Sequence, residues 1–138
     1  MKTDNVIKRL RWVMACVIFF DFANTLLGQP ATYWHHPETV NEHNPLFHSL
    51  LAHGYLLFVL FHLIYLTGAF FIVSFVRKRF ALIILFSLIL CHYYGGATWL
   101  DRHWGFGTAG LIIYGVLLAT ILVLLGFPKN VNEVRTSS

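Results

Sequence analysis

The sequence predicts an all-α fold, a four-helix transmembrane bundle, and three observations lead to this prediction. Of the 138 residues, 57% are hydrophobic and only 12% are charged, whereas a soluble domain carries roughly 25% charged residues. Four apolar segments each reach the roughly 20 residues that a membrane-crossing helix needs. Short basic clusters separate these segments, as topology signals do in membrane proteins. We therefore expect a single integral membrane domain over residues 1–138, embedded in the lipid bilayer.

In chain order, the predicted spans are residues 10–28, 45–76, 80–100 and 107–127. The first has the basic start and apolar run of a signal peptide, but Asp21, Asn24 and Thr25 interrupt it, and we expect a retained helix. The second is longer than a bilayer requires and is expected to tilt or to project beyond the hydrocarbon. Asn44 and Pro45 mark its start, because Asn caps helices and Pro suits the first helical position.

The distribution of basic residues predicts the orientation of the chain. Three clusters lie before the first span, between the second and third, and after the fourth: Lys2, Lys8, Arg9, Arg11, Arg77, Lys78, Arg79, Lys129 and Arg135. The other two loops contain Arg102 as their only permanently charged cation. The N- and C-termini are therefore expected in the cytoplasm, with loops 29–44 and 101–106 on the extracytoplasmic side of the plasma (inner) membrane. These clusters explain the net charge of +4, so we expect no nucleic-acid binding.

Depth in the membrane can be counted along each predicted helix, at about 1.5 Å per residue, from the basic residues that flank it. By this count, the polar side chains within the apolar segments are expected in one layer, ~15–22 Å from those basic residues. This layer contains Asp21, Asn24, Thr25, His62, His92 and Tyr114. Ionisable groups inside a membrane are costly, so they normally face the bundle interior and pair. We expect Asp21 either to pair with His62 or His92, or to take part in metal binding or proton transfer. The two histidines are expected either to be packed through hydrogen bonds or to act as ligands.

Asp21, His62 and His92 have the composition of a two-histidine, one-carboxylate metal site with positions open for water or substrate. Zinc, iron, manganese or copper would suit these ligands. Further candidate ligands lie nearer the extracytoplasmic surface: Glu42, His48, His53 and His103. Asn24 or Tyr114 would orient a metal-bound water, which makes Asp21, Asn24 and Tyr114 the candidate catalytic residues. The predicted function is divalent-metal binding, with hydrolytic or oxidative chemistry on a membrane-soluble substrate.

Helical spacing adds an expectation about which side chains share a face. His48 is expected to face inward above His62, whereas His53 points elsewhere. In the third span His92 shares a face with Gly95 and Gly96, and these glycines would let another helix backbone come close.

Three other functions remain open. His62 and His92 lie on neighbouring predicted helices and are candidate axial ligands of a b-type haem. Asp and His at mid-depth would also suit a proton relay. Alternatively, the chain is a non-catalytic accessory subunit of a larger membrane complex or of a homo-oligomer, and its polar layer only fixes helix packing.

The motif D-x-x-x-T at residues 21–25, followed by Gly28 and by E-x-N-P at residues 42–45, resembles a family of small four-helix prokaryotic membrane proteins of uncharacterised function. The resemblance covers roughly residues 17–62, about a third of the chain. It implies a four-helix fold and no particular activity. It also implies a polar cluster of Asp21, Glu42 and Asn44. A lysine is expected deep in the second helix of such proteins, and His62 stands near that place.

Overall fold

The computed structural model describes residues 3–126, and within this range it contains helices and no strands. The α-helices are α1 (Thr3–Leu27), α2 (Pro45–Ala52), α3 (Tyr55–Phe75), α4 (Lys78–Arg102) and α5 (Gly107–Gly126), with short 3₁₀ helices η1 (Ala31–Trp34) and η2 (Pro37–Thr39). Four of them, α1, α3, α4 and α5, are long and apolar enough to cross a membrane. The prediction of an all-α protein with four membrane-length helices is confirmed.

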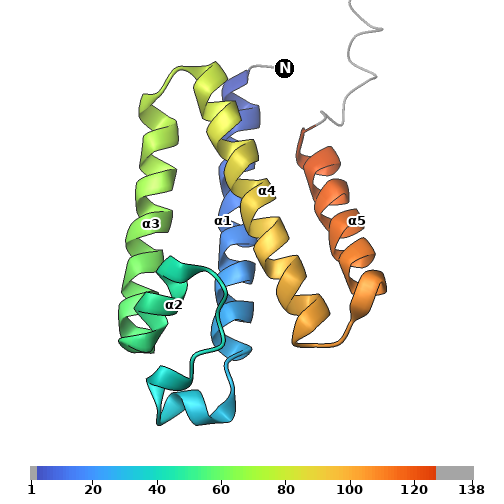
Figure 1. The fold of residues 1–138 in the computed structure, drawn as a ribbon. Coiled ribbons are helices and arrows are strands. Elements are labelled where there is room, and N and C mark those ends of the chain that lie inside the picture. Colours follow the sequence, from blue (N-terminus) through green and yellow to red (C-terminus); the bar gives the residue numbers. More distant parts are fainter. Residues whose placement is uncertain (1–2, 127–138) are drawn as a thin grey trace, which may run out of the picture.

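The four long helices run alternately up and down. In Figure 1, α1 and α4 lie side by side, α3 packs on one side of this pair and α5 on the other. The start of α1, the turn between α3 and α4, and the end of α5 share one end of the bundle (Figure 1). Some residues used in the orientation and span predictions lie outside the described residues: Lys2, Phe127, Lys129 and Arg135.

The structure replaces the single long span predicted at residues 45–76 with two helices. The side chain of Asn44 accepts hydrogen bonds from the backbone of Leu46 and Phe47, so the predicted helix start is confirmed. The helix ends at Ala52, and Gly54 follows with φ 121°, a backbone conformation that side-chain-bearing residues rarely adopt. The 21 residues of α3 then extend about 32 Å, close to the thickness of the hydrocarbon core. No tilt or projection of a long helix is needed.

The bundle interior is centred on the contact between α1 and α4. Met14 and Ile18 of α1 and Leu85 and Ile89 of α4 are fully or almost fully buried there. Large apolar side chains such as Phe75 cover the outer faces of the helices, as expected for surfaces that contact lipid. Among the residues whose side chains the structure describes, five that are polar or ionisable are nevertheless buried: Asp21, Thr25, Gln29, His62 and His92.

The segment between α1 and α2 is fastened onto the bundle by two polar side chains. Tyr33 is 1% exposed, and its hydroxyl donates to the carbonyl of Leu51, 3.0 Å away. The Gln29 side chain accepts from the backbone nitrogen of Asn41 at 2.8 Å and donates to the carbonyl of Thr25 at 2.8 Å. These contacts hold residues 41–44 over the end of α1.

Candidate functional site

Asp21 lies where α1 packs against α4, and it is only 6% exposed. Gly95 of α4 makes room for it, because a Cβ atom there would stand 2.6 Å from both carboxylate oxygens. At Gly96, a Cβ atom would stand 3.0 Å from the ring of Phe20. The prediction that this pair of glycines allows a close helix approach is confirmed. Any larger residue at position 95 would displace the carboxyl group of Asp21.

His92 of α4 connects Asp21 to Tyr65 of α3. Its Nδ1 lies 2.8 Å from Oδ2 of Asp21, and its Nε2 lies 3.0 Å from the Tyr65 hydroxyl. A carboxylate only accepts hydrogen bonds, so Nδ1 donates to Asp21; in the tautomer that carries its hydrogen on Nδ1, Nε2 accepts from the Tyr65 hydroxyl. Of the two histidines expected to pair with Asp21, the structure selects His92. One hydrogen-bonded chain therefore links α1, α4 and α3.

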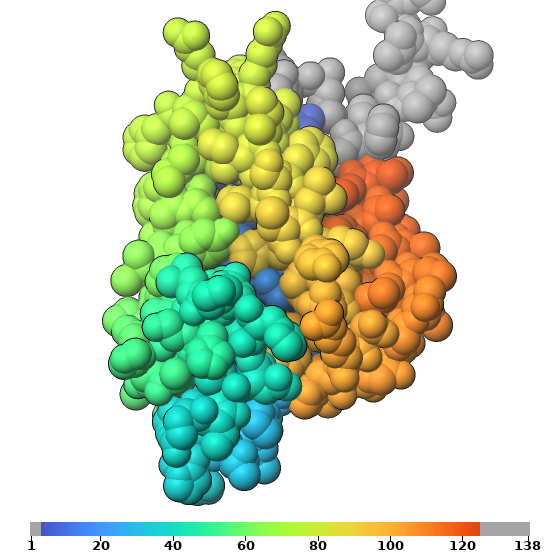
Figure 2. All heavy atoms as spheres, in the orientation of Figure 1, coloured from blue at the N-terminus to red at the C-terminus, as the bar shows by residue number. Residues whose placement is uncertain are grey.

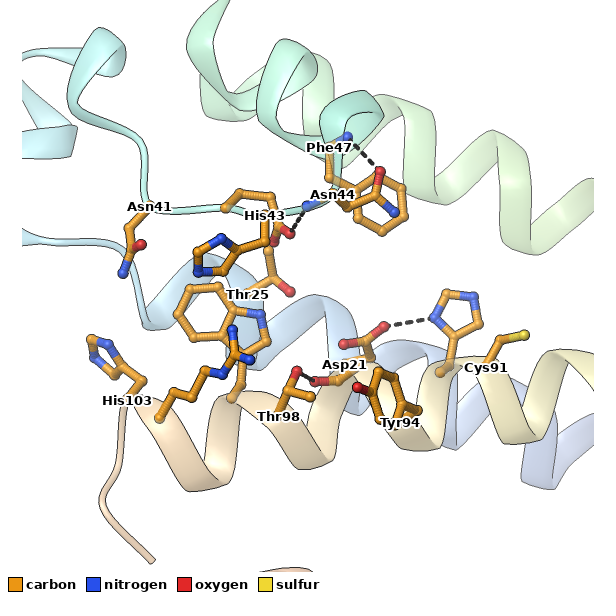
Figure 3. A pocket seen from close by; sticks show the side chains of 15 residues that line it. Asp21, Thr25, Asn41, His43, Asn44, Phe47, Cys91, Tyr94, Thr98 and His103 are labelled. Carbon is orange, nitrogen blue, oxygen red and sulfur yellow. Dashed lines mark hydrogen bonds and ion pairs between the residues drawn. The ribbon is translucent and has the colours of Figure 1, made fainter. Parts of the chain in front are cut away.

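A pocket of about 530 Å³ lies over Asp21. Figure 2 shows atoms of α1, in blue, at the bottom of a hollow between α4 and the segment that leads into α2. Oδ1 of Asp21 has no hydrogen bond to any residue that the structure describes. The pocket is lined by Asp21, Thr25, Asn41, Glu42, His43, Asn44, Phe47, Cys91, His92, Tyr94, Gly95, Thr98, Trp99, Arg102 and His103 (Figure 3). A carboxylate oxygen is thus available to whatever enters the pocket.

Glu42 is the second carboxylate of this pocket. Its Oε1 accepts a hydrogen bond from the backbone nitrogen of Asn44 at 2.7 Å. Burial raises the pKa of Glu42 above its ordinary value, and the charge of Asp21 adds to the increase. Hydrogen bonds from the backbone of Asn44 and His43 act in the opposite direction. Two acidic side chains, one from α1 and one from the loop, therefore line the same pocket.

Aromatic and basic side chains complete the wall. Phe47 from α2 and Tyr94 and Trp99 from α4 line the pocket, which makes it amphipathic. Arg102 and His103 also line it, but both are exposed at the end of α4. Asp21, Glu42 and Asn44 all line this pocket.

The structure divides the predicted outer ligands into two groups. Glu42 and His103 line the pocket. His48 and His53 are exposed on α2 and at its end, outside the pocket lining. His48 does not face inward above His62, because the break at Gly54 removes the continuous helix on which that expectation depended. His53 instead uses Nδ1 to contact the carbonyl of Ser49 at 2.7 Å.

His62 is buried at 6% exposure, but it is enclosed by aromatic rings and does not line the pocket. Its Nδ1 donates to the carbonyl of Phe58, 3.0 Å away. The centroid of its ring lies within about 6 Å of those of Phe22, Phe47, Phe58 and Phe61. This environment agrees with the packing alternative for His62.

Asn24 and Tyr114 also lie outside the pocket lining. The Asn24 side chain donates to the carbonyl of Phe20 at 2.8 Å and accepts from the Trp104 indole at 3.1 Å. Tyr114 of α5 packs against the rings of Phe20 and Tyr93, with centroids 4.7 and 4.9 Å away. The water-orienting function expected of Asn24 and Tyr114 has no support in this arrangement.

A metal site is likewise not supported. Within the described part of the chain, no group of three or more His, Cys, Asp or Glu side chains is arranged to hold a metal ion. Asp21 and His92 are paired with each other, while His62 is directed to a backbone carbonyl. A b-type haem held by His62 and His92 would need a free ring nitrogen on each histidine. Both ring nitrogens of His92 already have hydrogen-bond partners, so the arrangement gives no support to this alternative.

Comparison with known proteins adds nothing to this description. No protein-family model, curated protein or solved structure matches the chain.

Sequence reasoning missed several residues of the site. Tyr65, whose hydroxyl is hydrogen-bonded to His92, lies three residues after His62 in the same apolar segment. This short distance from a predicted site residue was the only indication in the sequence that Tyr65 belongs to the site. Thr98 and Trp99 lie one to two turns after His92, on the same helix. Asn41 comes from the loop, and nothing in its sequence context distinguishes it from other loop residues.

Proposed function

We propose that the protein binds a small amphiphilic molecule in the pocket over Asp21, and that the molecule presents a protonated amine or a similar hydrogen-bond donor to this carboxylate. The observation that carries the proposal is the free Oδ1 of Asp21 beneath a pocket of about 530 Å³. Binding sites for small molecules usually measure about 300–1,000 Å³ and combine apolar walls with few polar groups.

The lining favours a cationic end group over an anionic one. Asp21 and Glu42 are both acceptors, and burial makes ionised carboxylates costly unless a positive charge or a donor approaches them. The faces of aromatic rings also attract cations, and Trp99 and Phe47 are in the wall. Arg102 is exposed at the rim, so solvent screens its charge more than the charge of Asp21.

The geometry supports binding better than base catalysis by His92. A histidine that acts as a general base must lie within hydrogen-bond reach of the proton it abstracts. The proton within reach of Nε2 of His92 is that of the Tyr65 hydroxyl, and Tyr65 does not line the pocket, so a molecule in the pocket does not meet this pair. Nδ1 of His92 is hydrogen-bonded to Asp21. His92 therefore orients the carboxylate, and Asp21 is the group that meets the ligand.

The proposed location is the plasma (inner) membrane, with the pocket open to the extracytoplasmic side. Four membrane-length helices support an integral membrane protein. The basic residues of the α1 start and of the α3–α4 turn lie at the end of the bundle away from the pocket. The positive-inside rule assigns such an end to the cytoplasm.

The test uses two probes of the same size, 2-phenylethylamine and 2-phenylethanol, titrated by calorimetry into the protein in a nonionic detergent. The amine should bind more tightly by about ten- to a hundredfold, because a hydrogen bond to a charged group contributes roughly 1.5–3 kcal/mol. Asp21→Asn should remove this preference. Asp101→Asn, which changes the same charge on an exposed residue outside the pocket, should keep it.

Equal binding of the amine and the alcohol to the unaltered protein would overturn the proposed ligand class. An equal effect of Asp21→Asn and Asp101→Asn would overturn the assignment of Asp21 as the contact residue. The thermal unfolding midpoint of both variants, measured in the same detergent, separates a loss of binding from a loss of fold.

A further inference from the structure

A second cleft, of about 470 Å³, lies at the opposite end of the bundle. It is formed by the first turns of α1, the last turns of α3 and the start of α4. Its lining combines basic and apolar side chains: Asp4, Ile7, Lys8, Arg11, Trp12, Phe70, Val73, Ser74, Val76 and Lys78. None of these residues belongs to the pocket over Asp21, so what this cleft binds does not depend on the function proposed above.

The positive charge of the cleft is only partly neutralised. Lys78 Nζ forms an ion pair with Oδ2 of Asp4 at 2.9 Å. Lys8 and Arg11 are three residues apart on one face of α1, so their side chains are neighbours. Two cations of the cleft therefore have no carboxylate partner among the described residues.

The guanidinium of Arg11 gives the strongest indication of a ligand. Its carbon atom lies 5.7 Å from the centre of the Phe70 ring, which holds the side chain in place. Its Nε is buried and has no hydrogen-bond partner among the residues that the structure describes. A buried donor without a partner is costly. A guanidinium presents its N–H groups in a planar fork that fits the oxygens of phosphate.

The apolar half of the cleft suits the remainder of a lipid. Trp12 packs edge-on against Phe70 with centroids 5.6 Å apart, and Val73 is buried beside them. Trp is enriched at the level of lipid headgroups, where one side of the ring is apolar and the other is hydrated. Basic pockets between membrane helices are a recurring type of site for anionic headgroups.

We propose that this cleft binds the phosphate group of an anionic phospholipid, with Arg11 and Lys8 as its ligands. Arg11 donates to the phosphate oxygens from the N–H groups at the end of its guanidinium, and Lys8 contributes a second positive charge. The acyl chains lie along Trp12 and Phe70. The headgroup must be anionic overall, because the choline of a zwitterionic lipid would place a cation beside Lys8 and Lys78.

The test counts lipid adducts by native mass spectrometry after titration of the purified protein with phosphatidylglycerol or phosphatidylcholine. Phosphatidylglycerol should bind more tightly, and Lys8→Gln/Arg11→Gln should weaken it by about tenfold. The matched control is Arg77→Gln/Arg79→Gln, which removes the same charge at the same end of the bundle but outside the cleft, and it should keep the adduct.

Competition with inorganic phosphate tests whether the cleft recognises a free phosphate ion or requires the phosphate group of a lipid. If phosphate displaces phosphatidylglycerol, the anion alone suffices for the site; if it does not, the contacts of the acyl chains are also required. Equal binding of the two lipids, or an equal loss in the cleft and turn variants, would overturn the proposal.

Arg11→Lys covers the case in which the double variant does not fold, because it keeps the charge and most of the aliphatic stem on Phe70. This variant should bind phosphatidylglycerol more weakly than the unaltered protein, since lysine lacks the planar fork of N–H groups. Unchanged binding would count against Arg11 as a ligand.

Discussion

Oδ2 of Asp21 and Nδ1 of His92 are 2.8 Å apart, and this hydrogen bond joins α1 to α4 across 71 positions of the sequence. Both side chains are less than 10% exposed. The bond therefore contributes to the packing of the two helices at the centre of the bundle, and it holds the carboxylate in its orientation toward the pocket.

Replacement of His92 by Phe should destabilise the protein strongly. Phe roughly preserves the volume of the ring but leaves Asp21 buried without its donor, and a buried polar group left without a partner costs about 1–3 kcal/mol, or more when it is charged. His48→Phe, at an exposed position of α2, is the control and should have little effect. The measurement is unfolding of both variants by denaturing detergent. Equal stability of the two would show that the Asp21–His92 bond is not a stabilising contact.

Gly95→Ala should also destabilise the bundle, by about 1–3 kcal/mol, because the added methyl group would overlap the carboxylate of Asp21. Gly68→Ala is a matched control within α3, since no atom lies within 4 Å of a Cβ at that position. There the substitution should be neutral or stabilising, because alanine favours helices by up to about 1 kcal/mol over glycine. If both changes have the same effect on unfolding, close packing at Gly95 is not a determinant of stability.

The raised pKa of Glu42 predicts a dependence of stability on pH. A carboxyl group whose pKa is higher in the folded protein binds its proton more tightly there, so stability falls as the pH rises through the interval from the ordinary value of 4.5 to the raised one. Glu42→Gln should reduce this fall, measured as the thermal midpoint against pH in detergent. Glu38→Gln, at an exposed position, should follow the unaltered protein. A steeper fall in Glu42→Gln would contradict the sign of the shift.

The two free cysteines test access to the pocket. Cys91 lines it, whereas Cys16 is exposed on α1 away from it. In cells that carry single-cysteine variants, a membrane-impermeant maleimide added outside should modify Cys91 but leave Cys16 unmodified, because lipid excludes the reagent from Cys16. Modification after detergent extraction provides the control for reactivity. Labelling of Cys91 only from the cytoplasmic side would reverse the proposed orientation.

The helices were largely predictable because their signal is the length of the apolar segments, which requires no knowledge of tertiary contacts. The same holds for the start of α2, where Asn44 and Pro45 act locally. The break at Gly54 was not predictable in this way, since a single glycine in an apolar run is tolerated in many helices. Its positive φ is visible only once α2 packs beside α3.

The site was predictable only in part. Depth counted along the helices placed Asp21 and His92 at one level, and the structure pairs them. The direction of His62 depended on rings that come from three helices, including Phe22 and Phe47, and no pattern within one helix encodes that enclosure. The wall formed by residues 41–44 depended on Gln29 and Tyr33, whose partners lie 12 and 18 residues away.

Asp21 belongs to a helix long enough to cross a membrane, yet the space in front of it is bounded on one side by residues 41–44, which contain no such helix. A molecule that reaches the carboxylate passes between this segment and α4 (Figure 2), and the four long helices need not separate to admit it. For the ligand proposed above, the connection from residue 28 to residue 44 is therefore the part of the chain whose length and side chains would govern entry. Changes in its length or side chains would alter selectivity and leave the four long helices intact.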